Sequence, residues 1–371
     1  MFYEPDIAVI GGGPAGLMAA VTAAEAGATI LLLERDGHLG GQLVKQTHKF
    51  FGSEKQHASV RGIEIADLLS QKLAGLPDRA QVWTGATAIG LYEDGVLTIE
   101  HQGRYKKVRP KKIIAATGAS EKYLSFPNND LPGIYGAGAV QTMMNVHGVR
   151  PGKRVLMIGA GNIGLIVSYQ LLQAGVEVAA IVEGLPTIGG YMVHASKIRR
   201  AGVPILTSHT IVRADGTDAV ESAVIAKVDP FWNVITGTEQ TIPCDVICIA
   251  VGLSPLAELL WQAGCDMRYV KELGGHVPVR NEYLETTVPG LYIAGDLTGI
   301  EEASAAMVEG HLAGLEAAAS LGFKTESYRE ERQDCLEQLR QLRAGPAGEK
   351  IRQGVKLTLK QESGQEVDHA V

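Results

Sequence analysis

The 371-residue sequence has little of several features that mark particular protein classes. Four cysteines in so long a chain do not make the disulfide framework of a small secreted domain. Apolar runs such as Val246–Val251 are far shorter than the ~20 residues that a membrane span needs. No basic block stands out, and 34 basic against 41 acidic residues give a net charge of −7. Binding of nucleic acid or of an anionic membrane surface is therefore not expected.

The length and composition describe an enzyme-sized folded protein. Single hydrophobic cores stop growing at about 250–300 residues, so this chain is expected to form two or three domains. Hydrophobic residues make up 46% of the sequence, and its 45 glycines indicate many tight backbone positions. The first apolar run, Ile7–Ile10, starts almost at once and without the features of a secretory signal. Together with the few cysteines, this predicts a cytoplasmic protein.

The most informative segment is the glycine turn Gly11–Gly16. It follows the strand-like run Asp6–Ile10 and precedes Leu17–Gly27, whose Leu and Ala content is typical of a helix. The first glycine permits a sharp turn, Gly13 leaves room for a pyrophosphate, and the last glycine allows close packing of helix on strand. Glu34 lies 18 residues beyond the turn, where a carboxylate can accept hydrogen bonds from a ribose. The pattern predicts a dinucleotide site.

A second segment repeats this arrangement. Arg154–Ile158 leads into Gly159–Gly164, and the later strand-like run Val176–Val182 ends at Glu183, 19 residues beyond the turn. Two glycine turns predict two dinucleotides. Glu183 would repel a 2′-phosphate, and Gly184–Pro186 contains no arginine to neutralise one. The second site is therefore expected to prefer NAD(H) to NADP(H).

The two turns, with three further motifs, resemble the flavoproteins with two dinucleotide-binding domains that are related to thioredoxin reductase. Gly40–Leu43 resembles the segment that carries the chain past the flavin, and Ile113–Gly118 resembles the strand and turn that close the first half of the FAD domain. Leu291–Asp296 resembles the second FAD fingerprint. Taken singly, these motifs could be a turn, a strand end and an N-cap for a helix at Ala303–Ser320. Their joint occurrence in the family order is what carries the resemblance.

The resemblance implies an α/β protein with two Rossmann-like, doubly wound domains. The FAD domain is expected to be discontinuous, at 1–121 and 251–323, with an NAD-type domain inserted at 122–250 and a helical tail at 324–371. Leu131–Ile134 and Val251–Pro255 are expected to be the crossing segments, because both have the Pro and Gly content of linkers.

The resemblance also implies the residues that bind each cofactor. For FAD they are Gly11, Gly13, Pro14, Ala15, Gly16, Glu34, Arg35, Gly41, Gln42, Thr117, Gly118, Gly295 and Asp296. For NAD(H), or for ATP or ADP in its place, they are Gly159, Gly161, Asn162, Ile163, Gly164 and Glu183.

The sequence departs from the disulfide reductases of this superfamily, which need two thiols close together. It contains no C-x-x-C pair. Cys244 and Cys248 fall on one strand-like run, where their spacing would separate them by roughly 13 Å, too far for a disulfide. We expect them to be core residues and the thioredoxin reductase activity to be missing.

A closer resemblance is to the alpha-type FAD subunits of heteromeric dye-linked amino acid dehydrogenases, which include proline and hydroxyproline dehydrogenases, opine oxidases and hydrogen cyanide synthase. The segments that carry it are Gly41–Gly52, Gly189–Pro204 and Gly295–Ser304. It implies an oligomeric assembly in which a second flavoprotein subunit oxidises the small-molecule substrate. Many alpha-type subunits carry a cysteine-rich extension for an iron–sulfur centre, but the tail here has only Cys335. A small iron–sulfur protein is therefore expected as a separate partner.

The tail begins with a helical pattern that places four apolar residues close to one stripe: Tyr328, Leu336, Leu339 and Leu342. The stripe could pack on its own domain or dock another protein of the assembly. A short alternating run, Val355–Leu359, follows, and the last ten residues are expected to be loose.

Candidate catalytic side chains are few, because flavin and nicotinamide perform hydride transfer themselves. Lys45 and His48 could stabilise charge on a reduced flavin or could be surface residues of a loop. Phe50 and Phe51 could stack on a ring or fill the core. The histidines are scattered, so no metal site is expected.

The sequence leaves three functions open. The chain could be an NADH-linked FAD oxidoreductase that handles electrons within an amino acid dehydrogenase assembly. It could be a stand-alone NADH:acceptor reductase or oxidase. It could also be a structural subunit whose second site holds a non-redox adenine nucleotide.

Overall fold

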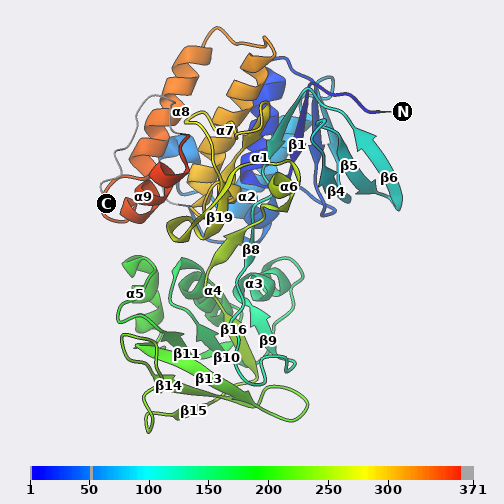
Figure 1. Cartoon of the computed structure of the whole chain (residues 1–371). Helices are drawn as coiled ribbons and strands as arrows, with labels where there is room; N and C mark the ends of the chain where they lie inside the picture. Colours follow the sequence, from blue (N-terminus) through cyan, green and yellow to red (C-terminus); the bar gives the residue numbers. More distant parts are fainter. Residues whose placement is uncertain (1, 51–52, 361–371) are drawn as a thin grey trace. The chain divides into compact units, whose positions relative to one another are not determined.

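The computed structural model describes residues 2–50 and 53–360, and the chain forms two compact units. Unit 1 contains the residues up to Ser120 and those from Ser254 onward, and unit 2 is Glu121–Leu253. Figure 1 colours the chain by sequence, so that the two blocks of unit 1 appear in blue to cyan and in yellow to red.

Unit 1 is built on a parallel five-stranded sheet in the order β20-β7-β1-β2-β3. Its three central strands are short apolar runs buried on both faces, as strands of covered parallel sheets are. The strands of this sheet are β1 (Ile7–Ile10), β2 (Ile30–Leu33), β3 (Ala80–Trp83), β7 (Lys112–Ala115) and β20 (Leu291–Ile293). The segment β20 comes from the second block of the chain, which makes the unit discontinuous.

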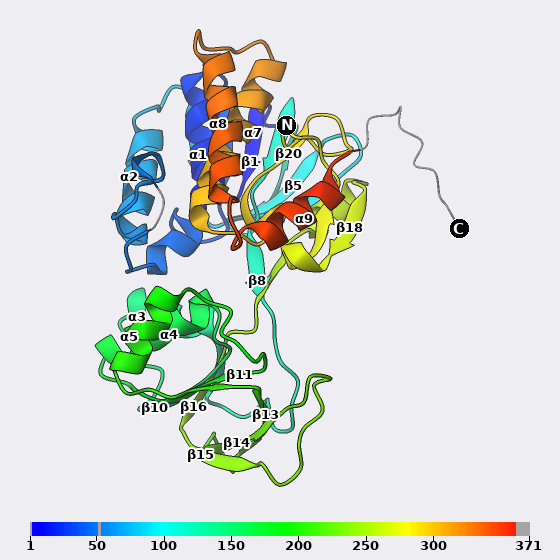
Figure 2. The same cartoon turned by 90° about the vertical axis from the view of Figure 1, so that its left-hand side faces the viewer.

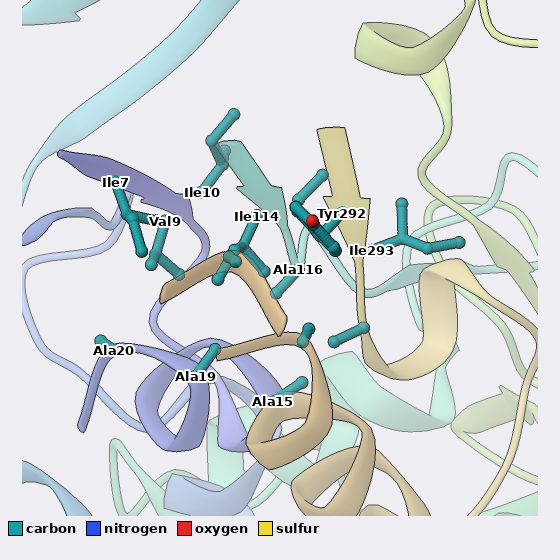
Figure 3. Close-up of a cluster of buried hydrophobic side chains, with 14 of the residues drawn as sticks. Ile7, Val9, Ile10, Ala15, Ala19, Ala20, Ile114, Ala116, Tyr292 and Ile293 are labelled. Carbon is teal, nitrogen blue, oxygen red and sulfur yellow. The ribbon is translucent and has the colours of Figure 1, made fainter. Parts of the chain in front are cut away.

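Helices of small residues cover one face of this sheet. Figure 3 shows Ala15, Ala19 and Ala20 on α1 beneath the strands that carry Val9 and Ile114. Helix α7 packs closely on α1, because Gly310 and Gly314 have no side chain: a Cβ on them would lie 2.1 Å from the Ala15 carbonyl oxygen and 2.6 Å from that of Ala19. The helices of unit 1 are α1 (Pro14–Glu25), α2 (Gly62–Ala74), α6 (Glu258–Gln262), α7 (Ala303–Ser320), α8 (Tyr328–Leu342) and α9 (Glu349–Thr358).

Smaller elements complete unit 1. An antiparallel sheet β4-β5-β6 lies between β3 and β7 in the sequence, and a hairpin β18-β19 lies between β7 and β20. The strands are β4 (Ala86–Leu91), β5 (Leu97–His101), β6 (Arg104–Val108), β18 (Met267–Val270) and β19 (Gly275–Pro278). The 3₁₀ turns are η1 (Gly41–Lys45), η2 (Glu54–Gln56), η3 (Lys271–Leu273) and η4 (Gly295–Leu297).

Unit 2 repeats the plan with a parallel sheet in the order β12-β11-β10-β16-β9 and an antiparallel sheet β13-β14-β15. Figure 2 shows the helices of this unit on the opposite face of the parallel sheet from β13 and β14. The strands are β9 (Ile134–Gly136), β10 (Arg154–Ile158), β11 (Glu177–Glu183), β12 (Ile205–Thr207), β13 (His209–Asp215), β14 (Ser222–Lys227), β15 (Gln240–Pro243) and β16 (Val246–Ile249). The helices are α3 (Ala137–Asn145), α4 (Asn162–Gln173) and α5 (Met192–Arg200). The predicted α/β class with two Rossmann-like sheets is confirmed.

The chain passes between the units at residues 120–121 and 253–254, where β8 (Ala119–Glu121) pairs with β17 (Leu253–Pro255). The prediction that Leu131–Ile134 is a crossing segment is wrong. Leu131 and Ile134 pack on the apolar cluster of unit 2, and Ile134 begins β9. The Pro and Gly content of this segment belongs to a turn before a strand, in which Gly133 has a φ of +105°.

The C-terminal helices pack within unit 1. Cys335 and Leu339 of α8 are buried in its core, and Tyr328, Leu336 and Leu342 pack against that core. The apolar stripe predicted for the tail is thus covered by its own unit. The alternating run Val355–Leu359 is helical up to Thr358, because Ile351 and Val355 face Leu273 and its neighbours at helical spacing. The last ten residues lie outside the described part of the chain.

Two candidate dinucleotide sites

The first glycine turn accepts no other residue at its two ends. Gly11 has a φ of +104°, and a Cβ there would lie 2.3 Å from the Ala116 carbonyl oxygen. A Cβ on Gly16 would lie 1.8 Å from the Gly11 carbonyl oxygen. At Gly13, by contrast, the nearest atom to an added Cβ is 3.9 Å away, on Gly41. The turn is therefore closed by packing at both ends and open in the middle, as a pyrophosphate cradle must be.

Helix α1 begins at this opening without a capping side chain. Its N-cap is Gly13, Pro14 is the first residue, and the first turn contains no acidic residue. Proline is favoured there because its missing N–H would have had no helical partner. A helix N-terminus without a capping carboxylate or hydroxyl offers its amides and its partial positive charge to an external anion.

Glu34 holds the loop beside the cradle. It is only 6% exposed, and its two carboxylate oxygens accept the Gly12 N–H at 2.7 Å and the Asp36 N–H at 2.8 Å. Two bonds leave further lone pairs on the carboxylate, which can accept from a ribose diol at the end of β2. The next residue, Arg35, is exposed.

A pair of glycines covers the cradle from the other side. The Gly40 N–H donates to the Gly12 carbonyl at 2.8 Å. A Cβ on Gly41, which has a φ of +52°, would lie 2.8 Å from the Cα of Gly13. The 3₁₀ turn η1 starts here, with Gln42 exposed and Lys45 half-buried. Gly40 and Gly41 are therefore a close backbone contact with the cradle and more than a surface turn.

The second fingerprint meets the first. An added Cβ on Gly295 would lie 2.9 Å from the Cβ of Ala15, so the turn after β20 lies against the first turn of α1. Asp296 follows within η4, whereas the N-cap of α7 is Glu302, so Asp296 does not cap that helix. Burial, with Glu309 and Glu301 adding to it, raises the pKa of Asp296 to about 7. Two segments that are 280 residues apart in the sequence (295 − 15) thus lie in contact.

Sequence reasoning missed the buried charges that support Asp296. Glu309 of α7 is 2% exposed, and one of its oxygens accepts the Gly295 N–H at 3.0 Å and the Thr298 hydroxyl at 2.8 Å. Its other oxygen accepts from Arg343 at 2.7 Å, and Arg343 also makes a bidentate contact with Glu301. The available signal was the carboxylate of Glu309 in the middle of an Ala-rich helix pattern.

In unit 2 the second glycine turn has the same construction. Gly159 has a φ of +108°, and its added Cβ would lie 2.3 Å from the Ala250 carbonyl oxygen. A Cβ on Gly164 would lie 2.1 Å from the Gly159 carbonyl oxygen. A Cβ on Gly161 would have no atom within 4 Å apart from its chain neighbours. Helix α4 starts with Gly161 as its N-cap, again without a capping side chain, so Asn162 and Ile163 form its first turn.

The supports of the second turn also repeat. Glu183 accepts the Ala160 N–H at 2.8 Å and the Leu185 N–H at 2.9 Å, as Glu34 does in unit 1. The Gly190 N–H donates to the Ala160 carbonyl at 2.9 Å, and a Cβ on Gly190 would lie 2.8 Å from the Gly161 carbonyl carbon. Gly190 therefore makes the backbone hydrogen bond in unit 2 that Gly40 makes in unit 1, a match that the spacing of the two turns did not predict.

The remaining predicted residues have mixed surroundings. The Thr117 hydroxyl donates to the Leu256 carbonyl at 2.7 Å, so it ties the end of β7 to the returning chain, and Gly118 has a φ of +74°. His48 stacks on Phe50 at 5.4 Å between ring centroids, and Phe50 packs against the core of unit 1. Phe51 lies outside the described residues.

All four cysteines are described, free and buried: Cys244, Cys248, Cys265 and Cys335. Burial raises the pKa of Cys244 and of Cys335 to about 12, so neither is a thiolate at neutral pH. The prediction that Cys244 and Cys248 are core residues is confirmed. Among residues 2–50 and 53–360, no helix has the length and hydrophobicity required to cross a membrane.

The comparisons with known proteins agree with this architecture. The model of the pyridine nucleotide-disulphide oxidoreductase family matches residues 5–310. An opine oxidase subunit of Agrobacterium tumefaciens (strain Ach5) is 28% identical over 86% of this chain and 66% of its own length. The alpha subunit of the sarcosine oxidase of Corynebacterium sp. (strain P-1) is 26% identical over 86% of this chain and 33% of its own. The chain thus spans less than two thirds of these curated relatives.

Among solved structures, thioredoxin reductase of T. acidophilum matches with a TM-score of 0.71 and 23% identity, over 86% of this chain and 99% of that one. This likeness concerns the fold. The chain belongs to the pyridine nucleotide-disulphide oxidoreductase family, whose members are FAD-dependent oxidoreductases. The predicted resemblance to this superfamily and to opine oxidase subunits is confirmed.

Proposed function

We propose that unit 1 holds FAD, that unit 2 holds an adenine nucleotide, and that the chain is the electron-handling subunit of a heteromeric enzyme that oxidises an amine or amino acid. The observation that supports the FAD site most strongly is the contact of Gly295 with Ala15, because it puts Asp296 beside the cradle Gly11–Gly16. A site for FAD needs both groups: the glycine turn would bind the pyrophosphate, and Asp296 would lie on the flavin side of the pyrophosphate.

The residues present fit FAD. The N-terminus of α1 and the open position at Gly13 would receive the pyrophosphate, and Glu34 would accept from the adenosine ribose. Asp296, with a pKa of about 7, can donate a hydrogen bond when protonated and accept one when ionised. FAD, when bound, supplies the hydride and electron transfer chemistry, so this chain's task is to bind it, orient it and exclude water. Lys45 and His48 stay candidates for contact with the flavin.

Unit 2 fits a nucleotide without a 2′-phosphate. Glu183 would face the ribose and repel a phosphate there, and Gly161 leaves open space above the N-terminus of α4. NAD(H), ADP and ATP share the part of the molecule that these residues would contact. The second site therefore suits either a redox nucleotide or a structural one.

The subunit role rests on relatives. The two curated relatives are named as subunits of an opine oxidase and of a sarcosine oxidase. Four buried cysteines and no C-x-x-C pair argue against disulfide reduction in this chain. In this proposal the substrate is oxidised on a second flavoprotein subunit, with a small iron–sulfur protein as a further partner.

The test begins with the purified chain. We expect a yellow protein that releases FAD and an adenine nucleotide on denaturation, identified by mass spectrometry. We also expect slow NADH oxidation with artificial and natural acceptors when the chain is alone, and amine-dependent flavin bleaching when the second flavoprotein subunit is co-expressed. A colourless protein that does not take up FAD would overturn the proposal for unit 1. Rapid NADH turnover by the chain alone would replace the subunit role with that of a stand-alone reductase.

A further inference from the structure

The hairpin between β14 and β15 carries an aromatic residue in an unusual backbone conformation. Trp232 has a φ of +67°, in the left-handed region that bulky residues rarely adopt. Asp229 holds the turn, since its carboxylate accepts the Phe231 N–H at 2.9 Å and the Asn233 N–H at 2.8 Å. The backbone N–H of Trp232 donates to the Asp229 carbonyl at 3.0 Å. The conformation of Trp232 is therefore set by a dense local network.

This turn puts the indole against the loop that follows β11. A Cβ on Gly184 would lie 2.3 Å from Cζ3 and 2.5 Å from Cη2 of Trp232. Ser208, between β12 and β13, links the same two segments: its N–H donates to the Leu185 carbonyl at 3.0 Å, and its carbonyl accepts the Val228 N–H at 2.9 Å. The ring thus lies where a side chain at position 184 would be, and the absence of one lets it approach the backbone.

The ring is nevertheless largely in solvent. Trp232 is 59% exposed, although one edge of its indole touches Gly184. A large apolar ring left in water does not contribute the burial energy that tryptophan usually adds to a fold, and its left-handed backbone adds strain. Both costs are accounted for if the ring has a ligand to contact.

The position of the Trp232 ring indicates which part of a ligand it would contact. Gly184 directly follows Glu183, whose carboxylate is bonded to the Ala160 N–H of the second cradle and marks the ribose end of the site. The base of a bound nucleotide continues outward from its ribose, over the residues that follow the acidic one. All these residues belong to unit 2.

We propose that the indole of Trp232 stacks on the adenine base of the nucleotide held by unit 2. Gly184 makes room for the indole beside the ribose end of the site. This inference rests on the proposed function of unit 2, and it adds a base-recognising residue that the glycine motif does not contain. The ligand it fits is an adenine nucleotide without a 2′-phosphate, whether ADP, ATP or NAD(H).

Stacking of a base on an aromatic ring is lost on substitution by alanine, and it tolerates another aromatic ring. In the FAD-loaded protein we therefore expect Trp232→Ala to weaken ADP binding by about 10- to 100-fold by isothermal titration calorimetry, and Trp232→Phe to weaken it by about 5-fold or less. Phe231→Ala is the matched control: it removes an even more exposed ring from the same turn and should leave ADP affinity unchanged. Flavin content should be the same in all of these proteins.

Fluorescence gives a second measurement that does not depend on activity. The chain has three tryptophans, at 83, 232 and 261, and only Trp232 belongs to unit 2. In the double variant Trp83→Phe/Trp261→Phe, added ADP should quench the remaining emission. Gly184→Ala should displace the ring and reduce both the quench and the affinity. Titrations with NAD⁺ and ATP then show which nucleotide the site prefers.

The outcomes are separable. If Trp232→Ala binds ADP as tightly as the wild type, and ADP leaves the emission of Trp232 unchanged, the stacking role is refuted while the nucleotide site of unit 2 stands. If the wild-type protein binds none of ADP, ATP and NAD⁺, the proposed function of unit 2 fails and this inference fails with it.

Discussion

Units 1 and 2 place equivalent strands in the same order, β3-β2-β1-β7-β20 in one and β12-β11-β10-β16-β9 in the other. In both, the glycine turn follows the central strand and a glutamate at the end of the next strand accepts two backbone N–H groups. The outer strand differs in origin, since β20 follows all the other strands of its sheet in the sequence and β9 precedes all the other strands of its own. The same cradle is thus completed from different parts of the sequence.

The residue that follows the outer strand also differs between the units. The segment Val288–Asp296 aligns with Leu131–Ala139, and each has a Pro-Gly turn, a strand and a glycine at its eighth position. That glycine donates its N–H to a carboxylate in both, Gly295 to Glu309 and Gly138 to Glu121. The next residue is Asp296 in unit 1 and alanine in unit 2. The shared backbone position therefore carries a carboxyl group in unit 1 and a methyl group in unit 2.

The largest difference between the units should appear when a side chain is introduced into one glycine turn at a time. Valine at Gly13 or Gly161 meets no protein atom closer than 3.9 Å from its Cβ, so either variant should fold. Gly13→Val should lose FAD by at least about 100-fold in affinity and keep ADP binding, and Gly161→Val should do the reverse. Visible absorbance per chain and calorimetry with ADP measure the two. A yellow Gly13→Val protein would contradict the assignment of FAD to unit 1.

A second test concerns the buried charges of unit 1. Arg343→Met removes the cation that forms ion pairs with Glu301 and Glu309, and breaking a buried pair in this way costs about 3–5 kcal/mol. We expect a lower melting temperature and weaker FAD binding, because Glu309 also holds the Gly295 N–H.

The matched control for this test is Arg340→Met on the same helix. Its ion pair with Glu337 is exposed and should be worth no more than about 1 kcal/mol. Equal effects of the two substitutions on thermal unfolding would show that Arg343 does not hold the site.

The stability of unit 1 should depend on pH through Asp296, at a position where unit 2 has alanine. Asp296 has a pKa of about 7 in the folded chain against about 4 when unfolded, so the folded state binds the extra proton between these values. The contribution of Asp296 is therefore fully present below about pH 4 and is lost as the pH rises to 7.

Asp296→Asn removes this slope. In flavin-free protein we expect the variant to be more stable than the wild type by about 2–4 kcal/mol at pH 8, with the difference vanishing toward pH 4. Denaturant unfolding across this pH range measures the difference. A stability gap that does not change with pH would mean that folding does not raise the pKa of Asp296.

The smallest expected effect compares the two ribose-end glutamates. Glutamine at either position keeps one acceptor oxygen and places an amide NH₂ against a backbone N–H. Glu34→Gln should cost about 2 kcal/mol because Glu34 is buried, and Glu183→Gln about 1 kcal/mol because Glu183 is half-buried. Thermal unfolding of the two variants tests the order, and a larger loss at Glu183 would contradict it.

Much of the architecture was predictable from local sequence. The two glycine turns, the strands before them and the helix Ala303–Ser320 depend on short-range patterns, since a tight turn or a helical stripe is specified by neighbouring residues. The misassigned segment Leu131–Ile134 shows the limit: a Pro-Gly turn has the same composition whether it links domains or starts a strand. Glu309, Arg343 and Trp232 were missed because each acquires its role from a residue distant in sequence.

Sharp backbone turns, and the residues that close them, can be recognised in the sequence because those constraints act within a few residues. Which distant segments come to lie beside the turns depends on tertiary packing. It brought Gly295 to Ala15 and the Trp232 ring to Gly184, since close approach of backbones depends on how whole helices and strands pack. The two cradles therefore share a local sequence pattern and differ in the contacts that packing adds to it.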